Sequence, residues 1–373
     1  MGLTVDWDVA RRTAARVGGS DPFANSYLAD SLEPDLLELT AQAEQLVAAE
    51  TGLVSLSGAA KARVTDRAGW VDANLASFDR LTRPLLGKLN AASDDASDGE
   101  RGAIGSAVGR VFDPVAESLG PKVAGAQVGG LLGWMSGRVI GQYDLLIIED
   151  EKPDEQDWVY YVGPNVLSLE KRFGFPPREF RLWIAIHECT HRAQFTAVPW
   201  LRPYFLSLVN ELMDDVDPDP GRLFEAIKSA VEQKRSGTPG VTDGGLQQLM
   251  ASPKQRETLD KVSGLMSLLE GHGDIVMDRA GKGLIPSQPR FARVMSQRRS
   301  SASGPTKIMQ RLLGFEAKLA QYEEGEKFIH AVEASGGREL FDQVWTGPEA
   351  LPTIEEIREP QLWVDRTTSS AGA

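Results

Sequence analysis

His187-Glu188-Cys189-Thr190-His191 reads H-E-x-x-H and holds two of the four histidines in this chain of 373 residues. Residues four positions apart lie on the same face of an α-helix, so both imidazoles can point at one ion. Glu188 lies about 100° around the helix from His187, where it can act on a water held by that ion without being a ligand. The motif is therefore typical of zinc-dependent hydrolases, in which two histidines supply half of a tetrahedral site.

The residues around the motif predict a helix. Pro176-Pro177 fits a helix start, because proline is tolerated in the first turn, where its missing N–H costs nothing. Apolar and aromatic residues then recur at steps of three and four, and Pro199 ends the pattern. We expect an amphipathic helix of about five turns, which places both histidines on rigid structure.

A second segment, residues 265–278, carries ionisable side chains within an apolar run. Burying such groups is costly unless they are paired or bound to a metal. Glu270 and Asp274 share a helix face, so we predict Glu270 as the third zinc ligand and Asp274 as the acceptor for the outer N–H of a ligating histidine. His272 points about 200° away from Glu270 on an ideal helix. It remains the alternative third ligand if the flanking glycines distort the turn.

Three segments resemble an actinobacterial family of zinc-dependent metalloproteases, some of whose members are labelled as associated with the biosynthesis of a deazaflavin coenzyme. These segments are residues 180–183, 187–195 and 269–272, and the resemblance extends over most of the chain. It implies a zincin-like, mostly helical fold and a hydrolase, with no particular substrate. The pair of Glu270 and Asp274 is also similar to the third-ligand helix of gluzincin peptidases, although thermolysin-like enzymes have a much shorter connection between the two helices.

Together these observations predict a mainly α fold with a small β-hairpin or sheet (α+β) and a zincin-like catalytic core. We expect a helical region over residues 1–122, the metallohydrolase core over 123–345, and a C-terminal extension with a frayed tail over 346–373. Two strands, at 143–148 and 158–162, should form a hairpin just before the H-E-x-x-H helix. This hairpin could bind an extended substrate backbone by strand addition, or it could only cover the core, and the sequence leaves both interpretations open.

A run of five glycines marks another helix. Gly125, Gly129, Gly133, Gly137 and Gly141 recur every four residues, and such a ridge of small residues lets a second helix approach closely. Polar residues interrupt the stretch, so it lacks the uninterrupted run of about 20 apolar residues that spans a bilayer. We expect a buried helix packed against a neighbour and no membrane span.

Composition bounds the remaining possibilities. Hydrophobic residues make up 42% of the chain and charged residues 25%, as in soluble globular proteins. The net charge of −13 argues against binding to nucleic acid, which usually requires a basic face. The single cysteine suits a reducing compartment, and residues 1–6 do not resemble a signal sequence. We therefore expect a cytoplasmic protein, and the sequence leaves oligomer formation open.

Hydrolysis by activated water follows from these residues. Zn²⁺ held by His187, His191 and Glu270 would leave a fourth position for water and lower the pKa of that water towards about 7. Glu188 would take the proton as general base and then deliver it to the leaving group.

Two further side chains are candidates for the second donor to the developing oxyanion, Tyr322 and His272. The substrate is expected to be a peptide, or otherwise a small amide or ester. The alternative function is an inactive, zincin-like binding or interaction protein with a structural zinc. Glu188 argues against this alternative, because a closed structural site has no use for a base that is not a ligand.

Overall fold

The computed structural model describes residues 4–23, 26–79, 83, 87, 105–145, 157–214, 253–300 and 315–371. The described part is mainly α-helical with one small sheet, which confirms the fold class predicted from the sequence. The chain forms two compact units. Unit 1 comprises residues 1–42 and 59–188, and unit 2 comprises residues 43–58 and 189–373. The division into regions 1–122, 123–345 and 346–373 remains a prediction.

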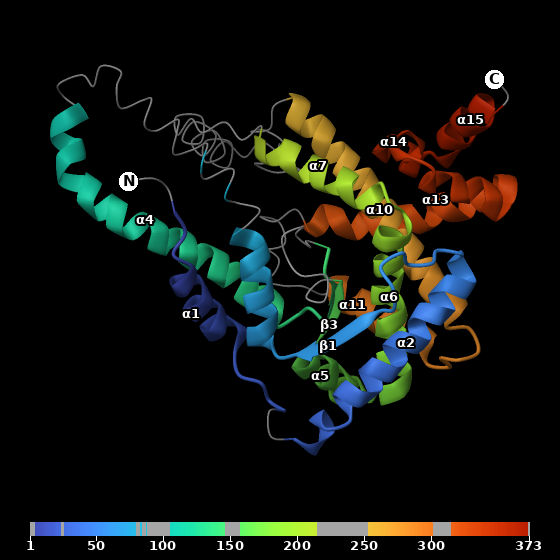
Figure 1. Cartoon of the computed structure of the whole chain (residues 1–373), viewed down its shortest axis with the longest axis horizontal. Helices are drawn as coiled ribbons and strands as arrows, with labels where there is room; N and C mark the ends of the chain where they lie inside the picture. Colours follow the sequence, from blue (N-terminus) through green and yellow to red (C-terminus); the bar gives the residue numbers. More distant parts are fainter. Residues whose placement is uncertain are drawn as a thin grey trace, which may run out of the picture. The chain divides into compact units, whose positions relative to one another are not determined.

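Unit 1 holds the sheet and its helices (Figure 1). Its elements are α1 (Trp7–Gly18), η1 (Tyr27–Ala29), the first half of α2 (Leu32–Thr51), β1 (Lys61–Thr65), α4 (Gly105–Ser136), β2 (Gly141–Tyr143), β3 (Trp158–Val162), α5 (Gly163–Phe173) and the first half of α6 (Pro177–Ala197).

The sheet has the order β1-β3-β2, so β2 is an edge strand. β2 pairs antiparallel with β3, with Gly141 opposite Tyr161, and this is the expected pairing of two strands before the motif helix. The first strand begins at Gly141, earlier than predicted, and its predicted end at 146–148 lies outside the described residues.

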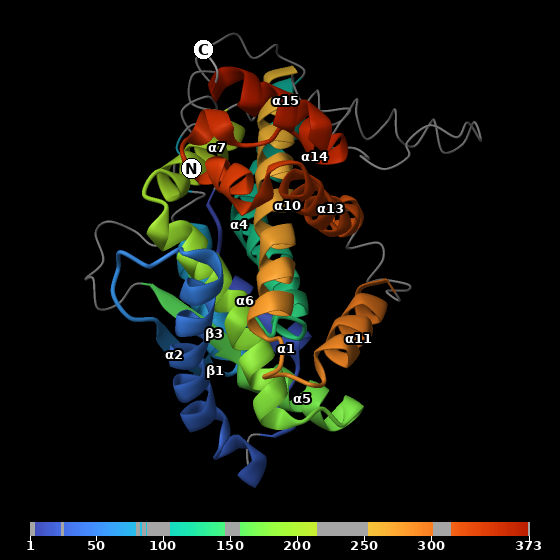
Figure 2. The same ribbon diagram turned by 90° about the vertical axis from the view of Figure 1, so that its right-hand side faces the viewer.

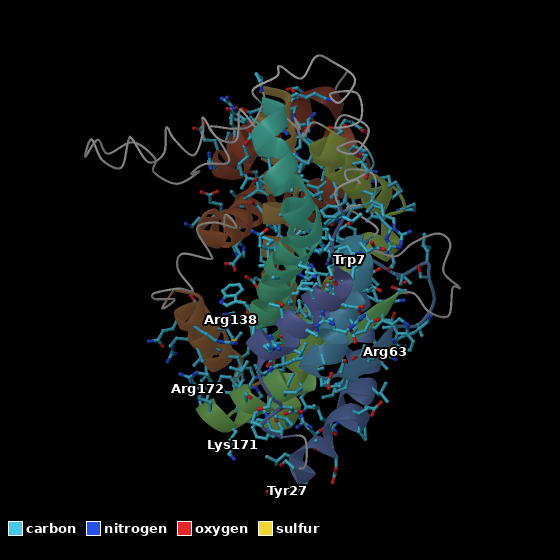
Figure 3. All side chains as sticks on the ribbon, turned by 90° about the vertical axis from the view of Figure 1, so that its left-hand side faces the viewer. Trp7, Tyr27, Arg63, Arg138, Lys171 and Arg172 are labelled. Atoms are coloured by element: carbon cyan, nitrogen blue, oxygen red, sulfur yellow. The ribbon has the colours of Figure 1, made fainter. Side chains whose placement is uncertain are left out.

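β1 pairs parallel with β3 and was not predicted, because the region 1–122 was expected to hold helices alone. That expectation was wrong at Lys61–Thr65. Cross-strand contacts hold the strand in place: the Arg63 guanidinium, labelled in Figure 3, lies 4.1 Å from the centre of the Trp158 ring. A cation over an aromatic face contributes about 0.5–1 kcal/mol at exposed sites.

The glycine ridge packs α4 against α1, and the two helices lie side by side in Figure 1. A Cβ atom added at Gly125, Gly129 or Gly133 would fall between 2.1 and 2.5 Å from a backbone carbonyl oxygen of residues 6–14. Only glycine permits this approach, as the sequence predicted. Gly137 and Gly141 follow the end of α4 and take no part in the ridge. None of the described helices is long and apolar enough to cross a membrane.

Unit 2 is built around α10, which is crossed by α13 and has α14 and α15 towards one end (Figure 2). Its elements are the second halves of α2 and α6, α7 (Leu201–Asp214), α10 (Pro253–Ala280), α11 (Gln288–Ser300), α13 (Phe315–Phe341), η3 (Asp342–Trp345), η4 (Pro348–Ala350), α14 (Ile354–Arg358) and α15 (Pro360–Ala371). A Cβ atom at Gly271 would lie 2.5 Å from the carbonyl carbon of Gly325. Gly271 therefore serves the close approach of α13, and α10 stays one continuous helix.

The ridge makes a stability prediction with a matched control. In Gly129→Ala the new methyl group would lie 2.1 Å from the carbonyl oxygen of Ala10, which cannot rotate away. We expect the free energy of unfolding to fall by about 1–3 kcal/mol, the usual cost of overpacking. Gly130→Ala, on the same helix and with nothing within 4 Å, should raise it by about 0.5–1 kcal/mol. Urea denaturation of both variants checks this, and equal shifts would refute the packing role.

Candidate metal centre

Helix α6 carries the H-E-x-x-H motif and is anchored on both sides of it. It begins at Pro177, as the sequence predicted, and runs for 21 residues. Before the motif, the buried Arg181 donates to Glu170 Oε1 on α5 at 2.8 Å. After it, the buried Arg192 donates to Glu44 Oε1 at 2.5 Å and to the Gly58 carbonyl at 2.8 Å. These contacts fix the rotation of the helix about its axis.

Three predicted ligands converge. One ligand atom each of His187, His191 and Glu270 lies within 4.8 Å of the other two. His191 Nε2 is 3.7 Å from Glu270 Oε2, and both side chains are about one-sixth exposed, at 15% and 17%. A tetrahedral zinc with bonds of about 2.0–2.1 Å separates its ligand atoms by about 3.4 Å. The three side chains therefore fit a zinc ion after shifts of about an ångström, and among the described residues no fourth histidine, cysteine or carboxylate converges with them.

The structure brings Glu270, and not His272, to the two histidines. His272 is 6% exposed. Its ring stacks on Phe341, with centroids 5.6 Å apart, and meets the edge of Trp345 at 5.2 Å. Glu270 and His272 are two residues apart on the continuous helix α10, so their side chains point to different faces of that helix.

Gln194 is a polar contact of the candidate site that the sequence analysis missed. Its Oε1 lies 3.0 Å from His191 Nδ1, and its Nε2 lies 2.9 Å from His272 Nδ1. The signal that could have found it is its position three residues after His191, on the same helix face. Towards His191, Gln194 makes the kind of contact that was expected of Asp274. The role of Asp274, half-buried on α10, stays a prediction.

Glu188 is buried beside the edge strand, within unit 1, at 6% exposure. A Cβ atom at Gly141, the first residue of β2, would lie 2.6 Å from Glu188 Oε1. The missing side chain at position 141 therefore makes room for this carboxylate, which the sequence analysis did not foresee. Glu188 is not among the three converging ligands. The Tyr322 side chain, predicted as an oxyanion donor, lies outside the described residues.

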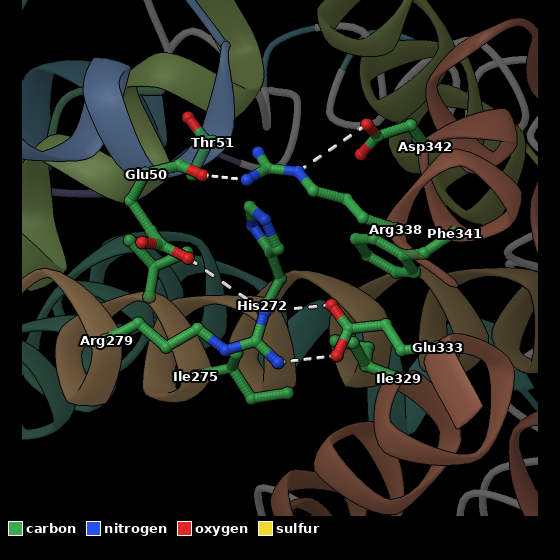
Figure 4. A pocket seen from close by; sticks show the side chains of 11 residues that line it. Glu50, Thr51, His272, Ile275, Arg279, Ile329, Glu333, Arg338, Phe341 and Asp342 are labelled. Carbon is green, nitrogen blue, oxygen red and sulfur yellow. Dashed lines mark hydrogen bonds and ion pairs between the residues drawn. The ribbon is translucent and has the colours of Figure 1, made fainter.

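A charged hollow lies next to His272 in unit 2 (Figure 4). Its two arginines are matched by acids: Arg279 donates to Glu333 Oε1 at 2.8 Å, and Arg338 Nε lies 3.6 Å from Asp342. Acidic side chains therefore balance both positive charges of the hollow. We interpret it as structural.

The environment of His272 keeps the ring neutral. Burial and, to a smaller extent, the neighbouring positive charges of His191, Arg338 and Arg279 together lower the pKa of His272 from 6.5 to about 3. A neutral imidazole retains one nitrogen as a hydrogen-bond acceptor, which the contact with Gln194 uses.

A helix with paired histidines and a glutamate from a second helix define a zincin-like site, and the comparisons with known proteins agree. The sequence matches the family described as "Zincin-like metallopeptidase" over residues 5–364, so this chain belongs to that family. It is also similar to a crystal structure described as "a putative hydrolase with a novel fold from Chloroflexus aurantiacus". The two share 30% identity and a TM-score of 0.68 over 98% of this chain and 99% of the other. Comparison with curated proteins gives no match. The actinobacterial and deazaflavin-related part of the resemblance stays a prediction.

The lowered pKa of His272 predicts a pH dependence of stability. In the unfolded chain a histidine takes up a proton below about pH 6.5, whereas the folded protein does so only near pH 3. The contribution of the buried, neutral His272 to the free energy of unfolding is therefore fully present above pH 6.5. It is lost as the pH falls towards 3, with a slope of up to about 1.4 kcal/mol per pH unit.

Urea denaturation of the metal-free protein between pH 4 and 7 measures this slope. His272→Gln should flatten it, because glutamine does not titrate. His330→Gln, at an exposed histidine, is the control and should leave the slope as in the wild type. Identical slopes in all three proteins would show that His272 titrates normally.

Proposed function

We propose that this protein is a zinc-dependent metallopeptidase whose ion is held by His187, His191 and Glu270. The observation that carries the proposal is the convergence of these three ligand atoms within 4.8 Å. Membership of the zincin-like metallopeptidase family supports the same chemistry. When bound, Zn²⁺ supplies Lewis acidity and brings the pKa of water to about 7.

Glu188 is the general base in this proposal. Its carboxylate takes a proton from the attacking water and passes it to the leaving amine, so that one residue serves both halves of the reaction. The contact with the Gly141 backbone supports this role, because it limits where the carboxylate can lie. A base with a fixed position loses little freedom on the way to the transition state.

The edge strand β2 is the proposed support for the substrate. β2 lies at the edge of the strand order β1-β3-β2, the position at which an extended peptide pairs by strand addition. Gly141 of β2 contacts Glu188, and a peptide bound along this edge would pass beside the general base. This contact favours substrate binding over a purely covering role for the strand pair.

The alternative, an inactive zincin-like interaction protein with a structural zinc, is less well supported. A structural zinc usually has four protein ligands, whereas three converge among the described residues. The single buried cysteine and the net charge of −13 support a proposed cytoplasmic enzyme that does not bind nucleic acid.

Metal content is the first test. Purified wild-type protein should hold about one zinc per chain, measured by atomic emission. His187→Ala, His191→Ala and Glu270→Ala should each lose it, because two remaining ligands are too few. His330→Ala should keep it. His272→Ala should also keep the metal when zinc is supplied in excess. Zinc lost without His272 and retained without Glu270 would instead establish a three-histidine site.

Activity of Glu188→Gln separates the enzyme from the binding protein. The substitution is nearly isosteric and removes no ligand, so zinc content and Tm should stay close to those of the wild type. Hydrolysis of peptides from a broad library should fall on the order of 10²-fold or more, the usual contribution of a general base. Glu179→Gln, on the same helix, is the control with unchanged turnover. Equal turnover in both variants would remove Glu188 from the mechanism.

A further inference from the structure

The Gln194 amide, in unit 2, is the centre of a hydrogen-bond network. Its partners are the His191 ring, the Leu269 carbonyl and the His272 ring. Gln194 is fully buried. Its Oε1 faces His191 Nδ1 at 3.0 Å, while its Nε2 reaches the Leu269 carbonyl at 3.0 Å and His272 Nδ1 at 2.9 Å. Every polar atom of this amide therefore has a partner.

The Leu269 carbonyl fixes which way the amide points. A carbonyl oxygen can only accept, so the atom of Gln194 that faces it must be the nitrogen. The amide oxygen then faces His191, and since it too can only accept, the proton of that ring lies on Nδ1. In the neutral ring the lone pair of His191 is then on Nε2, the atom that lies 3.7 Å from Glu270.

The same reasoning assigns the tautomer of His272. The second hydrogen of the Gln194 amide points at His272 Nδ1, which must accept it. Phe341 and Trp345 pack against the His272 ring and hold it in this orientation. His272 thus prevents rotation of the Gln194 amide.

We propose that Gln194 is a positioning residue that presents Nε2 of His191 to the metal, and that His272 acts through Gln194 as its second support. This inference rests on the proposed zinc site. It gives His272 a part in place of the ligand or oxyanion-donor roles considered from the sequence. Partners of this kind orient a metal-binding histidine, and their loss weakens metal affinity by about 10- to 100-fold.

Gln288 offers a matched control. It is also a buried glutamine of unit 2, at 7% exposure, and its amide bonds to the Met277 carbonyl at 3.2 Å and to Asp278 Oδ1 at 2.6 Å. Gln194→Met and Gln288→Met each remove a buried amide of the same size. Both are therefore expected to lower Tm, but only the first disturbs His191.

Zinc affinity, measured by competition with a chromogenic chelator, gives the first readout. Gln194→Met should raise the Kd for zinc by about 10- to 100-fold, whereas Gln288→Met should leave it unchanged. Gln194→Glu keeps an acceptor for His191, so its Kd for zinc should stay within a few-fold of the wild type, although Tm should fall because the second carboxylate oxygen faces the Leu269 carbonyl. His272→Phe keeps the aromatic packing but loses the acceptor, so its effect should be smaller than that of Gln194→Met. Equal affinity in the two methionine variants would overturn the proposal.

The histidine tautomers give a second readout that needs no metal. Long-range ¹H–¹⁵N spectra of the metal-free protein distinguish the Nδ1–H and Nε2–H forms, and each of the four histidines is assigned by its loss in a His→Gln variant. Wild type and Gln288→Met should show His191 as Nδ1–H and His272 as Nε2–H, and Gln194→Met should lose the preference at His191. His191 found as Nε2–H in the wild type would refute the proposal. Wild type that binds no zinc but shows these tautomers would instead refute the proposed function alone.

Discussion

The placement of two imidazoles on one rigid helix is the constraint on which the candidate site depends. A rise of about 1.5 Å per residue separates His187 and His191 by about 6 Å along the axis, so their side chains can share an ion only while α6 keeps its regular turn. The buried Arg181 before the motif and the buried Arg192 after it hold the helix in place. The third ligand must then come from another element, and α10 supplies Glu270.

Glycine residues allow the close approach of neighbouring elements in both units. In unit 1, Gly141 lets the backbone of β2 lie against the Glu188 carboxylate, and the α4 ridge lets α1 approach to backbone contact. In unit 2, Gly271 and Gly325 let α13 press on α10 directly beside Glu270. Glycine inside a helix costs about 0.5–1 kcal/mol relative to alanine. The close packing of the paired helices offsets this cost, and it leaves the ligand-bearing helix little freedom to shift.

Local patterns made part of this arrangement predictable. The periodicity around the motif predicted α6, and the ionisable residues in an apolar run drew attention to Glu270, because a helix face is decided by neighbours three and four residues away. β1 was missed, since Lys61–Thr65 is a strand only through its pairing with the distant β3, in which Lys61 lies opposite Trp158. Gln194 was missed for the same reason: its partners Leu269 and His272 lie 75 and 78 residues away in sequence.

The chemistry of the amide explains why glutamine suits the position between two buried histidines. It accepts from one ring and donates to the other, whereas a carboxylate could only accept and would leave the Leu269 carbonyl facing another oxygen. A carboxylate at position 194 would also add a buried negative charge near Glu270, and burying a charge is costlier than burying an amide whose hydrogen bonds are all made. An uncharged bridge therefore orients His191, and Glu270 remains the only charged residue among the three proposed ligands.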